Sequence, residues 1–126
     1  MKHFDTTHLS DEQKNILIKR GTEAPFTGEY VNNHEAGMYH CAWCDAALFA
    51  SDTKFDSGSG WPSFWESVDP SKVTLIDDES LGMHRVEVRC STCDGHLGHL
   101  FEDGPTDKTG QRYCINSCAL QFKKRP

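Results

Sequence analysis

Two short stretches, C-A-W-C at residues 41–44 and C-S-T-C at residues 90–93, each contain a pair of cysteines separated by two residues. A C-x-x-C pair in a tight turn presents two thiolates, and two such pairs complete a tetrahedral four-sulfur zinc site. Four thiolates leave no open coordination position, which indicates a structural metal. Because the pairs are far apart in the sequence, the zinc would join two distant hairpins.

Other interpretations of the cysteines are open at this point. Six cysteines could form three disulfides in a secreted protein, but the chain begins without the apolar segment of an export signal. A redox C-x-x-C is expected in a βαβ context, which the sequence lacks. His40 and His96 lie near the pairs and could replace a cysteine ligand. We favour one structural zinc per chain, bound by Cys41, Cys44, Cys90 and Cys93.

Length and charge restrict the class of protein. The chain has 126 residues with 37% hydrophobic composition, which predicts a single domain over residues 1–126. Its net charge is -6, and the only basic run is 123–125, so we expect no nucleic-acid partner. No apolar run has the length of a membrane span, and we expect a cytoplasmic monomer.

The clearest predicted helix begins after Ser10. Ser10 and Gln13 have the spacing of a capping box, and acidic residues follow the cap. Lys19 and Arg20 suit the other end of the helix dipole, and Gly21 is a plausible stop. Residues 16–18 are apolar and would dock this helix on the core.

Short strands and turns dominate the rest of the chain. The run 84–89 alternates polar and apolar residues, which places Val86 and Val88 on one face. Further strands are predicted at residues 38–41, 73–76, 99–101 and 112–115. The pattern predicts a mostly antiparallel β domain with a helical N-terminal segment, and periodicity alone does not give the strand order.

The residues around Cys114 suggest a reactive thiol. Arg112 lies two positions earlier, so both side chains would share one face of a strand, and a nearby cation lowers a thiol pKa. His96 and His99 have a spacing that could reach one substrate oxygen. The alternative is ordinary: a free cysteine is usually a small buried apolar residue, and histidines are often merely hydrogen-bonded.

Three ordered motifs resemble a known family. They are G-W-P-S-F at residues 60–64, H-L-G-H-x-F-x-D-G-P at 96–105 and R-Y-C-I-N-S at 112–117. With both C-x-x-C pairs they resemble the methionine-R-sulfoxide reductase B family, and the similarity covers nearly the whole chain. The resemblance implies a β-tent of two antiparallel sheets, with the zinc opposite the active site.

The resemblance also implies an activity, the reduction of the R epimer of methionine sulfoxide, free or in oxidised proteins. Cys114 would attack the sulfoxide sulfur and become a sulfenic acid, which lies on the reversible part of the cysteine oxidation ladder. Arg112 would help to stabilise the thiolate. Phe101 would contribute to the apolar pocket, although ordinary core packing explains a phenylalanine there equally well.

Five more residues receive roles from the resemblance. Trp61 would lie against the methyl group of the substrate, where an aromatic face stabilises developing positive charge. His96, His99 and Asn116 would hold and help to protonate the oxygen, because a sulfoxide oxygen leaves only after gaining a proton. Asp103 would orient a water molecule for that step.

The sequence departs from the usual family pattern at two positions. Ser59 stands where many members have a resolving cysteine, and Cys118 stands where a small residue such as alanine is usual. Cys118 is a possible resolving residue, but residues 115–122 contain no glycine or proline to signal a turn. In an unbroken strand, positions four apart are separated by about 13 Å, too far for a disulfide. We therefore expect an external thiol, such as thioredoxin, glutaredoxin or glutathione, and a packing role for Cys118.

The alternative function is a non-enzymatic, zinc-linked β module that binds a protein partner, because fold alone does not fix function. A pure binding module would have no need of Trp61, the two histidines and Cys114 together. A disulfide oxidoreductase is disfavoured because both C-x-x-C pairs are assigned to zinc, and a nucleic-acid-binding zinc ribbon is disfavoured by the negative charge.

Overall fold

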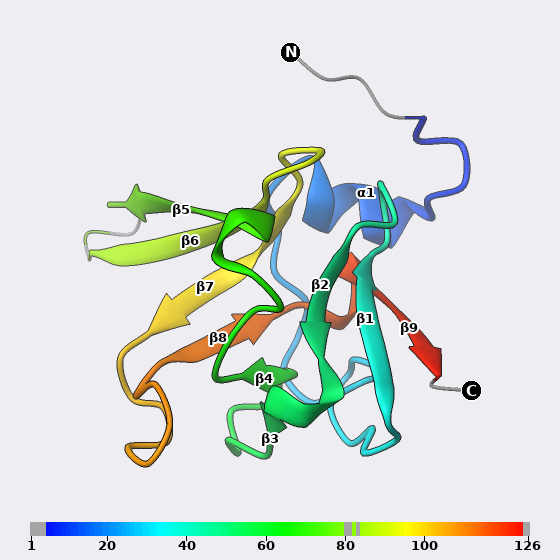
Figure 1. Cartoon of the computed structure of the whole chain (residues 1–126). Helices are drawn as coiled ribbons and strands as arrows, with labels where there is room; N and C mark the ends of the chain where they lie inside the picture. The colour runs from blue at the N-terminus through cyan, green and yellow to red at the C-terminus, as the bar shows by residue number, and fades with distance from the viewer. Residues whose placement is uncertain (1–4, 80–81, 83, 125–126) are drawn as a thin grey trace.

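The computed structural model describes residues 5–79, 82 and 84–124 (Figure 1). Within these residues one α-helix is present, α1 (Asp11–Leu17), and it begins with the predicted capping box. Ser10 Oγ accepts a hydrogen bond from Gln13 N, and Gln13 Oε1 accepts one from Ser10 N. These bonds satisfy N–H groups that the first helical turn leaves without intrahelical partners.

The end of the helix differs from the prediction. Its C-cap is Ile18, and Arg20 rather than Gly21 has a left-handed backbone, with φ of 59°. Ile18 does not dock on the core as expected: it is 45% exposed, whereas the two residues before it are buried. The guanidinium of Arg20 binds the carboxylate of Glu87 in the large sheet. Helix propensity contains no information on such a tertiary contact.

All strand pairings are antiparallel, and they form two sheets (Figure 1). The small sheet has the order β2-β1-β9 and consists of β1 (Gly37–Cys41), β2 (Ala47–Ala50) and β9 (Leu120–Lys124). The large sheet has the order β3-β4-β8-β7-β6-β5. Its strands are β3 (Lys54–Phe55), β4 (Ser63–Phe64), β5 (Val73–Asp78), β6 (Arg85–Cys90), β7 (His96–Phe101) and β8 (Arg112–Ile115). The described residues also include the short 3-10 turns η1 (Ser51–Thr53), η2 (Pro70–Lys72) and η4 (Ser117–Ala119).

Aromatic residues fill the space between the sheets. Phe64 of β4 stacks on Phe49 of β2, with ring centroids 4.6 Å apart, and meets Tyr39 of β1 edge-on at 5.2 Å. All three side chains are fully buried. Aromatic pairs in these geometries add packing energy beyond the apolar area that they bury. The core therefore fixes the large sheet, which carries Cys114, against the small one.

The prediction of a mainly β protein with two antiparallel sheets and a helical N-terminal segment is confirmed. Each predicted strand is present: β8 has the predicted bounds, β1, β5 and β7 are longer than predicted, and β6 lies one residue later than predicted. The sequence did not predict β2, β3, β4 and β9. Two of these have only two residues, which is too short for a periodic pattern.

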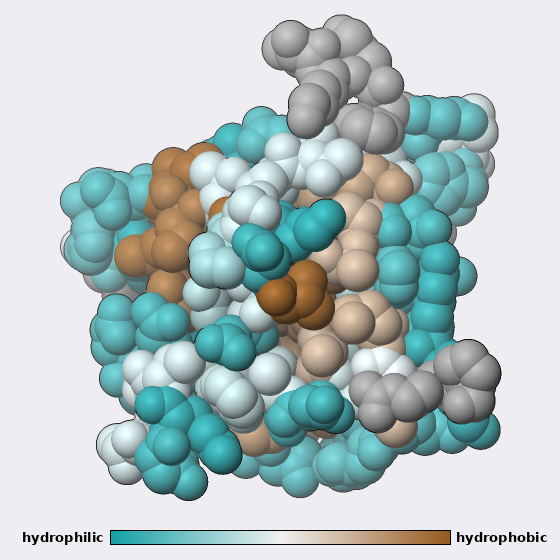
Figure 2. Space-filling model, viewed as in Figure 1, coloured by the Kyte–Doolittle hydropathy of each residue, from teal (hydrophilic) through white to brown (hydrophobic). Residues whose placement is uncertain are grey.

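Hydrophilic residues cover much of the face shown in Figure 2, and apolar residues gather where the outer edge of the large sheet lies. Leu75 of the edge strand β5 is among the exposed apolar residues. In the basic run near the C-terminus, Lys123 Nζ lies 2.8 Å from Asp45, and Arg125 lies outside the described residues. Across the described part of the chain, helices are too short or too polar to cross a membrane.

Candidate active site and metal centre

Two turns of matching geometry carry the paired cysteines. In the β1–β2 turn Asp45 N donates to Cys41 O, and in the β6–β7 turn Asp94 N donates to Cys90 O. Asp45 and Asp94 have φ of 70° and 65°, in the left-handed region that aspartate tolerates better than most residues. One turn belongs to each sheet, and both lie beside α1 (Figure 1).

The four sulfur atoms of Cys41, Cys44, Cys90 and Cys93 lie within 4.8 Å of one another and could hold a metal ion. Cys41 Sγ is 3.6 Å from Cys93 Sγ, and Cys44 Sγ is 3.5 Å from Cys90 Sγ. Each of these contacts crosses from one turn to the other, and the cysteines are not in disulfides. A bound ion would therefore join the two sheets.

The histidines considered as alternative ligands have other partners. His40 Nδ1 lies 2.8 Å from the carbonyl oxygen of Asp45, and His96 Nδ1 lies 2.7 Å from Glu87 Oε2. Neither histidine belongs to the sulfur cluster. The structure thus supports the four-cysteine set over a mixed cysteine–histidine set.

Cys114 lies on the face of the large sheet that carries most of the predicted site. In the β7–β8 ladder Cys114 is directly opposite His99, and Arg112 is opposite Phe101. In the β6–β7 ladder His99 is opposite Glu87. Directly paired residues in an antiparallel sheet share a face, so all five side chains project from the same side.

A bulge in β7 brings His96 to this face as well. Val88 pairs with Gly98 and Arg89 pairs with His96, so Leu97 has no partner on β6. Residues three apart in a regular strand point to opposite faces, and one extra residue reverses that relation. The rings of His96 and His99 accordingly meet edge-on, with centroids 5.5 Å apart.

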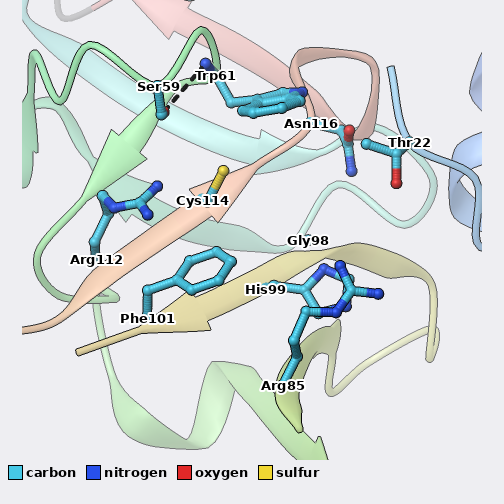
Figure 3. A pocket seen from close by; sticks show the side chains of 10 residues that line it. All are labelled: Thr22, Ser59, Trp61, Arg85, Gly98, His99, Phe101, Arg112, Cys114 and Asn116. Carbon is cyan, nitrogen blue, oxygen red and sulfur yellow. Dashed lines mark hydrogen bonds between the residues drawn. The ribbon is translucent and has the colours of Figure 1, made fainter. Parts of the chain in front are cut away.

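A cavity of about 160 Å³ opens above this face, and Figure 3 shows its lining. The Cys114 sulfur points into the space between the Trp61 ring and the side chains of Arg112 and Phe101. The cavity brings together six predicted site residues: Trp61, His99, Phe101, Arg112, Cys114 and Asn116. Two predicted residues, His96 and Asp103, are not part of its lining.

Opposing effects act on the thiol of Cys114. Burial raises its pKa, because the thiolate loses solvation. The charge of Arg112 and hydrogen bonds from Ser59 and Arg112 lower it, and the charge of Glu23 raises it. Burial prevails, so the pKa lies above the ordinary value of a cysteine. Arg112 and Ser59 therefore limit, rather than abolish, the cost of forming a thiolate here.

Asp103 holds Arg112 in place. Arg112 Nε donates to Asp103 Oδ1 at 2.8 Å, and a second guanidinium nitrogen donates to Oδ2 at 3.2 Å. The guanidinium also lies over the Phe101 ring, 4.5 Å from its centroid. A two-pronged ion pair with a stacked ring fixes the orientation of an arginine. The carboxylate of Asp103 thus acts on Arg112, and its contact with a water of the oxygen site stays a prediction.

Each histidine of the pair has its own carboxylate. Nδ1 of His96 lies 2.7 Å from Glu87, and Nε2 of His99 lies 2.8 Å from Asp78 Oδ2. His99 reaches the cavity, whereas His96 is 2% exposed. Burial lowers the pKa of His96, and the hydrogen bond to Glu87 opposes this effect. His99 is therefore held through Nε2 at the cavity, and His96 is held through Nδ1 beneath it.

Glu23 connects two cavity residues through its backbone. Its carbonyl oxygen accepts a hydrogen bond from Trp61 Nε1, and its N–H donates to Asn116 Oδ1, both at 3.0 Å. Asn116 Nδ2 donates to Leu97 O, also at 3.0 Å. The amide of Asn116 is thus oriented on both sides, and one of its N–H groups is left for the cavity.

Sequence reasoning missed three lining residues, Thr22, Arg85 and Gly98, and it singled out Ser59 only as the residue at the usual resolving position. The position of Gly98 could have been anticipated, since it lies between the two histidines. A Cβ at Gly98 would lie 1.9 Å from the carbonyl oxygen of Cys114, so only glycine allows β8 to approach. Thr22 lies in a segment without regular structure, and periodicity gives no signal for it.

Cys118 lies in different surroundings from Cys114. The expectation of an unbroken strand through this region is wrong, because β8 ends at Ile115 and the 3-10 turn η4 follows. Cys118 N donates to Glu23 Oε1, and the side chain packs on the core. Burial, followed by contacts with the carboxylates of Glu12 and Glu23, raises the pKa of its thiol. Because the chain turns here, the separation of Cys114 and Cys118 expected for an unbroken strand no longer excludes a disulfide between them. The carboxylates around the Cys118 thiol nevertheless favour a packing role.

The chain is similar to known proteins over most of its length. The SelR domain matches residues 9–124. A peptide methionine sulfoxide reductase MsrB of Thioalkalivibrio sulfidiphilus is 56% identical over 115 residues, which cover 91% of this chain and 83% of that relative. A protein of the same name from a Synechococcus species is 56% identical over 117 residues, covering 93% and 85% respectively. These similarities extend over the metal centre and the cavity alike.

Proposed function

The chain belongs to the SelR domain family of MsrB peptide methionine sulfoxide reductases, and from this premise we propose that it reduces the R epimer of methionine sulfoxide to methionine. The single observation that carries the proposal is the position of Cys114, between an indole and a guanidinium and directly opposite His99. A thiol so placed can meet a sulfoxide sulfur while proton donors face the oxygen.

The proposed reaction transfers one oxygen atom. The sulfur of Cys114 attacks the sulfoxide sulfur and forms an S–S bond while the oxygen takes up a proton. The S–O and S–S bonds then break as the hydroxyl moves to the Cys114 sulfur, giving methionine and a cysteine sulfenic acid. The sulfoxide is reduced by two electrons and Cys114 is oxidised by two. Arg112 lowers the cost of the thiolate, and Asp103 orients Arg112 for this purpose.

Different side chains around Cys114 would contact different parts of the substrate. Trp61 and Phe101 offer aromatic surface to the S-methyl group. His99 and the remaining N–H of Asn116 face the cavity, where they would bind the oxygen. His96 would act on the same oxygen from beneath the cavity, through its Nε2 atom.

We propose further that the sulfur cluster binds one zinc ion. Zn–S bonds of about 2.3 Å in a tetrahedron require sulfur atoms about 3.8 Å apart. The contacts of 3.5 and 3.6 Å between the two turns fit this requirement. An ion with four thiolate ligands supplies stability rather than catalysis, so Cys41, Cys44, Cys90 and Cys93 would hold the two sheets together.

The sulfenic acid would be returned to the thiol by an external reductant. The first thiol forms a mixed disulfide with Cys114 and releases water, and a second thiol releases Cys114. Thioredoxin, glutaredoxin or glutathione would supply these thiols in a reducing compartment such as the cytoplasm. One chain contains every residue of the proposed site, which supports a monomer as the active form.

The test is to incubate the protein with separated R and S epimers of methionine sulfoxide and dithiothreitol, and to measure the methionine formed. We expect turnover of the R epimer, free or within a peptide, and none of the S epimer. No methionine from either epimer would contradict the proposal and would favour the non-enzymatic binding module.

A further inference from the structure

Glu87 of β6 is a carboxylate whose side chain is 0% exposed. Four hydrogen bonds surround it: Arg20 donates at 2.9 Å to Oε1 and at 3.1 Å to Oε2, while Arg89 Nε and His96 Nδ1 lie 3.0 and 2.7 Å from Oε2. Burial acts to raise the pKa of Glu87, but the hydrogen bonds from Arg89, His96 and Arg20 lower it below its usual value. Glu87 is therefore ionised at neutral pH.

The ionised carboxylate decides which nitrogen of His96 carries a proton. A carboxylate only accepts hydrogen bonds, so the proton between Glu87 and His96 lies on Nδ1. The other ring nitrogen, Nε2, is fully buried and has no hydrogen-bond partner within the described residues. Buried polar atoms are nearly always hydrogen-bonded, so Nε2 has the capacity for one further partner, such as a water molecule or a group of the substrate.

The position of His96 connects this nitrogen with the site. Its ring meets the ring of His99 edge-on at 5.5 Å, and His99 lines the cavity opposite Cys114. Since Nδ1 is bound to Glu87, Nε2 is the only ring nitrogen of His96 that remains for the reaction.

We propose that Glu87 is a positioning residue for sulfoxide reduction: it keeps a proton on Nδ1 of His96, so that Nε2 is the atom that takes up a further proton from solvent and passes it toward the departing oxygen. This inference rests on the proposed function, because it assigns the proton that the S–O cleavage requires. Arg20 and Arg89 keep Glu87 ionised, which extends the active site to the segment that follows α1.

The charges around His96 give the pH dependence a definite sign. The titratable and charged groups that face it are Glu87 and Arg89 of β6, His99 of β7 and Arg20 after α1. Burial lowers the pKa of His96; Glu87 opposes this effect, and Arg20 adds to it. If protonated His96 supplies the proton, activity falls as pH rises through the pKa of His96. Loss of Glu87 then moves this alkaline decline to lower pH, and loss of Arg20 moves it to higher pH.

The experiment compares Glu87→Gln, Arg20→Gln and the matched control Glu79→Gln. Glu79 lies 3.1 Å from Nδ1 of His84, a carboxylate–histidine pair at the exposed surface. We expect kcat of Glu87→Gln to fall about tenfold or more, by analogy with other carboxylates that orient functional histidines, with a smaller change in KM. The control should behave like the wild type. In ¹⁵N-histidine spectra, neutral His96 should carry its proton on Nδ1 in the wild type and lose this preference in Glu87→Gln.

Each outcome has one meaning. Opposite shifts of the alkaline limb in Glu87→Gln and Arg20→Gln, with the Nδ1–H form in the wild type, support the proposal. A wild-type pH profile in Glu87→Gln, or an Nε2–H form in the wild type, overturns it. If Glu87→Gln does not fold, Arg20→Gln and the wild-type spectrum still decide. If the wild type produces no methionine, the proposed function fails, while the spectra continue to test the role of Glu87.

Discussion

His99 lies directly opposite Cys114 in the β7–β8 ladder, so the thiol and the imidazole share one face of the sheet. Backbone hydrogen bonds on both sides of β7 hold this relationship, which is more rigid than one between two loops. Because Leu97 bulges out of β7, His96 joins the same face. A sheet face thus presents a nucleophile and two histidines in fixed order.

Cys114→Ser should abolish methionine formation, because a hydroxyl is far less nucleophilic than a thiol and cannot accept the oxygen. Cys118→Ser should keep single-turnover chemistry within about twofold of wild type, since Cys118 lies outside the cavity. The measurement is methionine formed per chain from one equivalent of sulfoxide. Retained activity in Cys114→Ser would reject the assignment of the nucleophile.

Arg112→Gln should shift the ionisation of Cys114 to higher pH. Burial already raises the pKa of this thiol, and Arg112 is the largest effect that opposes it. A rise of one unit would lower the thiolate fraction about tenfold at neutral pH. The rate of iodoacetamide alkylation at Cys114, followed by mass spectrometry against pH, measures the change. An unchanged profile would show that Arg112 serves the substrate rather than the thiol.

Cys93→Ser should lower the Tm by more than about 10 °C, because metal binding and folding are coupled and each kcal/mol shifts the Tm of a chain of this size by a few degrees. Zinc analysis of freshly purified, reduced protein should give one ion per wild-type chain. The cavity residues do not include the metal cluster, so chemistry at low temperature should change less than stability. Wild-type protein free of zinc and equally stable would contradict this expectation.

Local patterns in the sequence predicted the features that depend on short-range contacts. The capping box of Ser10 and Gln13 needs only the spacing of the two residues, and the bounds of β8 follow from its motif. The C-x-x-C pairs predicted a four-sulfur cluster because each turn forms locally. Their approach to one another is a tertiary feature, which only the chemistry of zinc suggested in advance.

Features that depend on long-range contacts were not predicted. The bulge at Leu97 follows from pairing with β6, and the spacing of His96 and His99 alone does not imply it. The turn η4 forms without glycine or proline because Cys118 N finds a partner in Glu23, far away in the sequence. The two-pronged contact of Asp103 with Arg112 likewise becomes visible only when the loop and β8 are placed together.

Trp61 offers a test that separates the aromatic surface from its hydrogen bond. Trp61→Phe keeps a ring and loses only the bond from Nε1 to the Glu23 carbonyl, so we expect a modest rise in KM. Trp61→Ala removes the wall of the cavity and should lower kcat/KM by about 100-fold or more. Steady-state kinetics with the R epimer measure both. Equal activity of the two variants would place the methyl group elsewhere.

Ser59→Cys should change how the sulfenic acid is removed. Ser59 lines the same cavity as Cys114 and lowers the pKa of its thiol, so a sulfur at this position starts close to the nucleophile. The new thiol would attack the sulfenic sulfur of Cys114, form a disulfide and release water. In the wild type, Cys118 contacts the carboxylates of Glu12 and Glu23, and its raised pKa leaves it a poor nucleophile.

The two proteins should therefore differ after one equivalent of sulfoxide without added thiol. The wild type should retain the sulfenic acid on Cys114, which dimedone traps, whereas Ser59→Cys should contain a 59–114 disulfide that excludes dimedone. Disulfide mapping by mass spectrometry and a count of free thiols distinguish these states. Thioredoxin should then reduce the disulfide of Ser59→Cys, while the wild type needs only a small thiol to regain activity. A stoichiometric bond between Cys114 and Cys118 in the wild type, formed at the rate of turnover, would instead identify Cys118 as the resolving residue.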